Sequence, residues 1–103
     1  MNKREIDYAF AASPAAGGTL QVTSGVHWLR MPLPFALAHI NLWLLEDDDT
    51  WTIVDTGVAT GESRSVWEQT FAGCMQNRDP ARVIATHLHP DHAGGAGWLC
   101  AKF

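Results

Sequence analysis

The 103-residue chain has little positive charge and no long apolar run. Seven Lys and Arg residues stand against eleven Asp and Glu, and the formal net charge of −4 gives no electrostatic reason to expect nucleic acid or an anionic membrane as a partner. No apolar run approaches the roughly 20 residues that span a bilayer. Residues 8–16 are apolar but short and are interrupted by Pro14, so we do not interpret them as a signal peptide.

Cysteine is also scarce. Cys74 and Cys100 are the two cysteines of the chain, and they form no CxxC pair, so a disulfide framework is not expected. We therefore expect a reduced, cytoplasmic protein. With 47% hydrophobic and 17% charged residues, the composition is that of a globular chain and not of a disordered one.

Turn-forming and β-forming residues divide the first half of the chain. Residues 1–19, which end in Pro, Ala and Gly, predict a loosely ordered lead-in, and the folded domain is expected over residues 20–103. One strand is predicted over residues 21–31, ended by Pro32 and Pro34. Residues 40–45 and 51–54 predict a β-hairpin whose turn is the acidic run 47–49.

The second half adds helices. A helix is expected over residues 62–71, where Val66, Trp67 and Phe71 are spaced to form one apolar stripe, and Gly73 would end it. Residues 82–86 predict a buried strand, and a second helix is expected beyond Gly95. The order β-β-β-α-β-α indicates an α+β fold with helices on one face of a sheet.

Four potential metal ligands, His87, His89, Asp91 and His92, fall within six consecutive residues. Side chains two residues apart in an extended segment point to the same side, so His87 and His89 are able to coordinate one metal ion together. Pro90 then changes the chain direction and allows the other two to turn toward the same pocket. Imidazole and carboxylate groups are good zinc ligands, and ligands at a strand end leave one side open for water and substrate.

The segment His87-Leu88-His89-Pro90-Asp91-His92 matches the HxHxDH motif of the metallo-β-lactamase superfamily, and residues 54–57 (Val-Asp-Thr-Gly) resemble its first motif. The resemblance runs from about residue 20 to the end and is closest to glyoxalase-II-like and lactonase-like hydrolases. It implies half of a four-layer αβ/βα sandwich with metals at one edge between the halves. It also implies that His87 and His89 bind a first metal and that Asp91 and His92 bind a second. Asp55 would be a nearby structural acid.

The chain departs from that family after His92. Family members complete the site with further histidine and aspartate ligands downstream, whereas residues 93–103 offer only Cys100, which we expect to be a helix-buried free thiol. We therefore expect the C-terminal half of the sandwich to be missing. The exposed apolar surface of such a fragment would favour self-association.

The resemblance implies a zinc-dependent hydrolase of a small-molecule ester, thioester, lactone or amide, with one or two zinc ions and with iron or manganese as alternatives. Asp91 would also hold and orient the attacking water. Two other functions stay open: a mononuclear iron enzyme that oxidises persulfides, and a non-catalytic fragment that binds metal weakly. His39 is a candidate for substrate contact, although a plain strand-edge histidine is the alternative. Three glycines near the motif, Gly94, Gly95 and Gly97, are interpreted as room for close packing.

Overall fold

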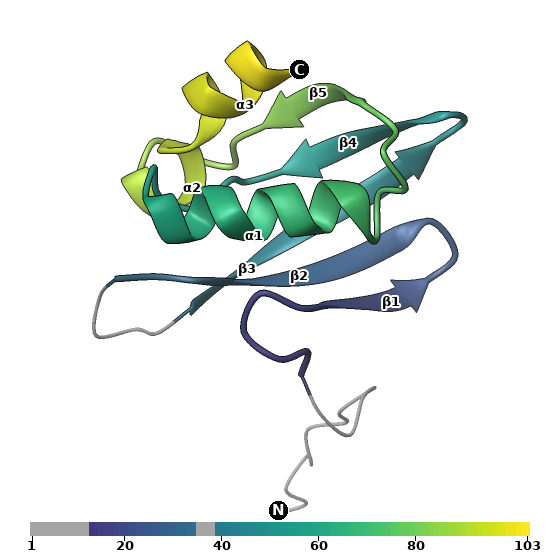
Figure 1. The fold of residues 1–103 in the computed structure, drawn as a ribbon, viewed down its shortest axis with the longest axis horizontal. Helices are drawn as coiled ribbons and strands as arrows, with labels where there is room; N and C mark the ends of the chain where they lie inside the picture. The colour runs from purple at the N-terminus through teal and green to yellow at the C-terminus, as the bar shows by residue number, and fades with distance from the viewer. Residues whose placement is uncertain (1–12, 35–38) are drawn as a thin grey trace, which may run out of the picture.

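The computed structural model describes residues 13–34 and 39–103, whose strands form a five-stranded sheet in the order β1-β2-β3-β4-β5. Strands β1 to β4 are antiparallel neighbours, and β5 pairs parallel to β4 after a helical crossover. The α+β class is therefore confirmed (Figure 1). The elements are β1 (Thr19–Thr23), β2 (Val26–Pro32), β3 (His39–Asp47), β4 (Thr50–Val54), α1 (Gly61–Ala72), β5 (Pro80–Ile84), α2 (Pro90–Ala93) and α3 (Ala96–Lys102).

The single strand predicted over residues 21–31 is wrong, because a tight turn divides this segment into β1 and β2. Thr23 pairs with Val26, and Gly25 between them adopts a φ of 76°, a left-handed conformation that glycine reaches at little cost. The turn was not predicted because β-forming residues lie on both sides of it. Residues 1–12 of the expected lead-in lie outside the described residues. Its last part is hydrogen bonded to β2, since the N–H of Gly17 donates to the carbonyl of Arg30 at 2.7 Å.

The predicted hairpin and first helix are confirmed. Strands β3 and β4 are joined by a turn at which Asp48 has a φ of 55°. Helix α1 begins after Thr60, whose hydroxyl accepts a hydrogen bond from the N–H of Ser63, and it ends at Gly73 as expected. Val66 and Trp67 are buried on one side of the helix, while the remaining sides are largely exposed.

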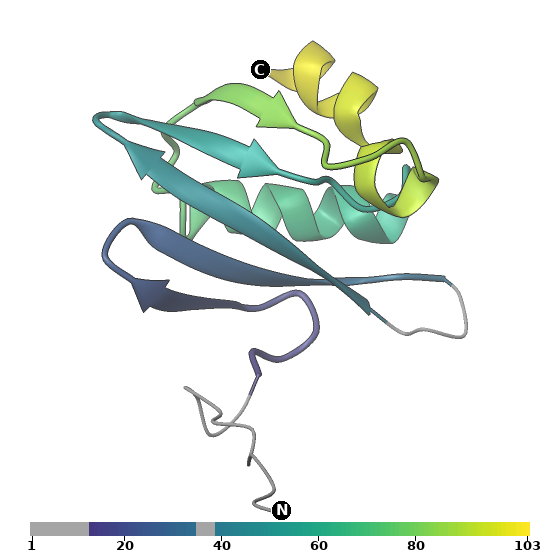
Figure 2. The same ribbon diagram turned by 180° about the vertical axis from the view of Figure 1, so that it is seen from behind.

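The helices lie on one face of the sheet, as predicted (Figures 1 and 2). Fully buried side chains on that face include Leu29, Leu42, Leu44 and Ile53, and they form the core with Trp67 of α1. Alternate positions point to the opposite face, which we call the open face because no described helix covers it. The half-buried or exposed apolar side chains of the open face are Leu20, Val26, Trp28, Trp43, Leu45, Val54 and Ile84.

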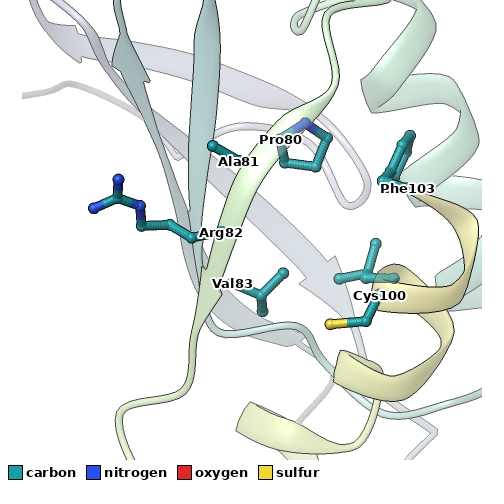
Figure 3. Close-up of a pocket in the computed structure, with 7 residues that line it drawn as sticks. Pro80, Ala81, Arg82, Val83, Cys100 and Phe103 are labelled. Carbon is teal, nitrogen blue, oxygen red and sulfur yellow. The ribbon is translucent and has the colours of Figure 1, made fainter.

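The strand predicted over residues 82–86 is confirmed as β5, which the structure places at Pro80–Ile84, but its predicted burial is wrong. Strand β5 is the last strand of the sheet, so its outer edge pairs with no other strand among the described residues, and Ile84 is 46% exposed. Helix α3 lies beside β5 and leaves a cavity of about 210 Å³ between them, into which Val83 and Cys100 point while Arg82 points away (Figure 3). Cys100 is helical but exposed, which corrects the expected burial.

The described helices are short. None of them has the length and apolar character needed to cross a membrane.

Candidate metal centre

The two sequence motifs meet at one edge of the sheet. Strands β4 and β5 are parallel and both end toward α2, so Asp55 after β4 and the histidine segment after β5 reach the same edge (Figures 1 and 2). The chains stay joined beyond the strands, because the N–H of Asp55 donates to the carbonyl of Ile84 at 2.7 Å. The parallel pairing therefore explains how residues more than thirty positions apart come together.

Asp55 is the most buried acid of this edge, with 4% of its surface exposed and a φ of 65°. Its carboxylate accepts hydrogen bonds from the N–H of Thr86 at 2.7 Å, from the Thr86 hydroxyl at 2.8 Å and from Nδ1 of His92 at 2.9 Å. Burial alone raises the pKa of Asp55, but the Thr86 N–H and the His92 and Thr86 side chains outweigh it and hold the pKa below its usual value. Asp55 is therefore an ionised acceptor that fixes its neighbours.

Thr56 and Gly57 attach the segment after the motif to the core. Thr56 is fully buried, its N–H donates to the carbonyl of His92 at 2.8 Å, and its hydroxyl accepts from the N–H of Gly95 at 2.9 Å. Gly57 has a φ of 77°, and a Cβ there would lie 2.8 Å from Cγ of Met31. The Asp-Thr-Gly turn therefore requires its small residue and its hydroxyl.

The glycines after the motif differ from one another. A Cβ at Gly95 would lie 3.2 Å from the Thr56 side chain, and one at Gly94 would meet the carbonyl of Pro90, so both provide the close packing that was predicted. A Cβ at Gly97 would meet no atom within 4 Å, so the same interpretation of Gly97 is wrong.

The three motif histidines lie together. The ring centroids of His87 and His92 are 3.8 Å apart, and those of His87 and His89 are 4.7 Å apart. Asp91 lies beside them, with Oδ2 at 3.5 Å from Nε2 of His92. Residues 86–90 are exposed, and Leu88 between the first two histidines is 93% exposed.

This donor set fits a divalent metal by its chemistry, since three imidazoles and a carboxylate are gathered at one accessible edge. Its arrangement is not preformed. Among the described residues, no group of three or more His, Cys, Asp or Glu side chains is placed to hold a metal ion.

His39 lies apart from this cluster in its contacts. It is the first residue of β3, opposite Pro32, and its Nδ1 lies 3.0 Å from Nη2 of Arg30. No contact links it to the motif histidines within the described part of the chain, so substrate contact by His39 stays a prediction.

Thr86 is the residue that sequence reasoning missed. It precedes the first motif histidine, and its hydroxyl contacts Asp55, His87 and His92. A hydroxyl residue between a β-branched strand and the histidine cluster was the available signal.

Comparison with known proteins agrees with this geometry. Residues 37–103 match the metallo-beta-lactamase superfamily. The chain is 37% identical over 73 residues to a probable metallo-hydrolase, YqjP, of Bacillus subtilis, covering 70% of this chain and 23% of that protein. It is 38% identical over 63 residues to a hydroxyacylglutathione hydrolase of an Enterobacter species, covering 60% and 22%.

Solved structures show the same relationship. The crystal structure of a beta-lactamase domain protein from Burkholderia ambifaria shares 53% identity and a TM-score of 0.79, over 87% of this chain and 27% of that one. A metallo-beta-lactamase family protein from Thermus thermophilus shares 30% identity and a TM-score of 0.69, over 79% and 27%. The chain thus spans about a quarter of the length of these relatives. It belongs to the metallo-beta-lactamase superfamily, whose fold it adopts over this part.

Proposed function

We propose that this chain carries the metal-binding part of a hydrolase that cleaves an ester, thioester, lactone or amide of a small molecule. The observation that carries the proposal is the Asp55–Thr86–His92 network, which anchors a cluster of three histidines and an aspartate at an accessible sheet edge. A buried acid that orients metal-binding histidines is the arrangement that metal sites use to fix their ligands.

His87 and His89 are the proposed ligands of a first metal, and Asp91 and His92 those of a second, with zinc favoured over iron or manganese. When bound, zinc lowers the pKa of a water ligand to about 7 and polarises the substrate carbonyl. Asp55 keeps the His92 ring in place through its hydrogen bond to Nδ1. Asp91 holds and orients the attacking water, and its half-exposed position at the start of α2 is open to that water.

Two relatives support the substrate class. The Enterobacter relative is a hydroxyacylglutathione hydrolase, and a human relative that is 29% identical over 80 residues is an acyl-coenzyme A thioesterase. Both names describe thioesters of small thiols, so a thioester is the first substrate class to test. The free thiols Cys74 and Cys100 support the proposed cytoplasmic setting.

The direct experiment transplants residues 37–103, the part that matches the family, into the Enterobacter hydrolase in place of the corresponding segment. The hybrid should bind zinc and hydrolyse hydroxyacylglutathione, because the transplanted segment contains both the proposed metal ligands and Asp55, which orients His92. The same hybrid with His89→Ala is the matched control and should lose hydrolysis.

A hybrid that folds and binds zinc but leaves the thioester intact would contradict the proposed hydrolase function. Equal hydrolysis by the hybrid with and without His89→Ala would contradict the assignment of that ligand. Far-ultraviolet circular dichroism of both hybrids establishes that they are folded before either result is used.

A further inference from the structure

The hydroxyl of Thr86 lies among three side chains that matter for the candidate centre. Oγ1 is 2.8 Å from Oδ2 and 3.1 Å from Oδ1 of Asp55, 3.2 Å from Nδ1 of His92 and 3.4 Å from Nδ1 of His87. The backbone N–H of the same residue donates to Asp55 at 2.7 Å. Thr86 is exposed, so water could have satisfied this hydroxyl, and its contacts therefore do not follow from burial.

The number of protons decides the direction of each contact. A threonine hydroxyl has one proton to donate and can accept with its lone pairs, whereas an ionised carboxylate only accepts. The Thr86 proton must therefore point to Asp55, at the shortest of these distances. The hydroxyl oxygen is then left to accept from the two histidines, which requires a proton on Nδ1 of each ring.

The two histidines depend on Thr86 to different degrees. Nδ1 of His92 also lies 2.9 Å from Oδ2 of Asp55, so its proton has a second and closer acceptor. His87 has only the longer contact to Thr86 among its side-chain hydrogen bonds within the described residues. Loss of the hydroxyl should therefore release His87 first and leave His92 largely in place.

We propose that Thr86 is a positioning residue that holds His87 and His92 in the tautomer protonated on Nδ1, which leaves Nε2 of each ring unprotonated for a metal. Nε2 of His92 lies 3.5 Å from Oδ2 of Asp91, the other proposed ligand of the second metal. The use of these nitrogens in metal binding rests on the proposed function. The tautomers themselves are a property of the metal-free chain, so they are measured separately from any activity.

The experiment compares three forms of the full chain: the natural sequence, Thr86→Ser and Thr86→Val. Serine keeps the hydroxyl, and valine replaces it with a methyl group of similar size. Histidine-selective ¹⁵N labelling reports the tautomer of each ring at alkaline pH without metal, by solution or magic-angle-spinning NMR. Thr23→Val, an exposed threonine of β1 with no described side-chain hydrogen bond, is the matched control.

The natural chain, Thr86→Ser and Thr23→Val should show His87 and His92 protonated on Nδ1. In Thr86→Val, His87 should move toward the Nε2-protonated form that free imidazole side chains prefer in water, while His92 keeps its tautomer. Zinc affinity should fall by about 10-fold in Thr86→Val, at the low end of the effect of groups that orient metal ligands, and should recover in Thr86→Ser.

His87 protonated on Nε2 in the natural chain would overturn the proposal, as would unchanged spectra in Thr86→Val. If the natural chain binds no zinc but shows the expected tautomers, the proposed metal function fails while the positioning role of Thr86 stands.

Discussion

The two segments that build the candidate metal centre differ in how firmly the fold holds them. Asp55, Thr56 and Gly57 are buried and almost every polar group they carry has a protein partner. His87 and His89, a few ångströms away, are exposed and lie on a loop beyond the edge strand. The acid that orients His92 is therefore buried, whereas Thr86 and the proposed ligands His87 and His89 lie at the surface.

The two faces of the sheet also differ in how far their side chains are buried. The helix-covered face buries Leu29, Leu42, Leu44 and Ile53 completely, but the open face leaves apolar side chains partly exposed, including the stacked rings of Trp28 and Trp43 at 6.1 Å. Exposed apolar surface of this kind favours association with another apolar surface.

The isolated 103-residue chain should self-associate and should have no appreciable hydrolase activity. Each proposed metal receives only two ligands from it, whereas a catalytic zinc normally has three from protein. The open face supplies the surface for association. Light scattering after size exclusion measures the mass, and thioester and lactone hydrolysis are assayed with excess zinc.

A substitution on the open face sharpens this prediction. Trp43→Gln should lower the associated fraction, whereas Leu88→Gln, at a side chain that is 93% exposed on the motif loop, should not. A monomeric natural chain that hydrolyses either substrate, and loses this activity in His89→Ala, would show that the prediction is wrong.

Asp55→Asn should weaken zinc binding by about 10- to 100-fold, the usual effect of removing a group that orients a metal ligand. The amide keeps the size of the side chain but cannot serve as a purely accepting partner for Thr86 and His92. Competition with a chromophoric chelator gives the affinity. Asp49→Asn, in the exposed β3–β4 turn, is the control. An unchanged affinity in Asp55→Asn would reduce Asp55 to a turn residue.

Several features of the fold could be predicted from the sequence alone. The hairpin, the helix with Val66 and Trp67 inward, and the membership of the family follow from periodicity and motif, because each is encoded within a few neighbouring residues. The split at Gly25 was missed because β-forming residues surround it. The exposure of β5 was missed because β-branched residues indicate a strand, but only the sheet order shows that it lies at an edge.

The candidate site was predictable in identity but not in arrangement. Spacing alone singles out His87, His89, Asp91 and His92. The contact of Thr86 with Asp55 joins strands β4 and β5 across a helix, so it depends on the parallel register and not on local sequence. The absence of a preformed group of three donors among the described residues likewise depends on side-chain placement.

Thr56→Val should destabilise the fold by about 0.5–1.5 kcal/mol, because it removes the hydrogen bonds that the buried hydroxyl makes with the N–H of Gly95 and the carbonyl of His92. The carbonyl of Gly57, at 3.1 Å, remains as an acceptor for the Gly95 N–H. Urea unfolding followed by tryptophan fluorescence measures the free energy of unfolding. Thr23→Val removes an exposed hydroxyl and should change that free energy by no more than about 0.5 kcal/mol. Equal effects of the two substitutions would show that Thr56 does not anchor the motif segment.

The smallest effect concerns the two thiols, which lie outside the proposed site. Burial raises the pKa of Cys74, and the nearby Glu46 raises it further, against the hydrogen bond with Thr19 that lowers it. Cys100 is exposed, so iodoacetamide at neutral pH should modify Cys100 before Cys74, because the thiolate is the reactive form. Peptide mass spectrometry over time gives both rates. Faster modification of Cys74 would contradict its burial.

Zinc uptake by the chain in equilibrium dialysis tests the candidate metal centre directly. The natural chain should bind zinc specifically, and the double variant His87→Ala, His89→Ala should lose nearly all of that binding, because both proposed ligands of the first metal are removed from an exposed loop. His39→Ala, at a histidine whose described contacts are with Arg30, should bind as the natural chain does. Equal zinc uptake by the double variant and the natural chain would contradict the assignment of the metal centre.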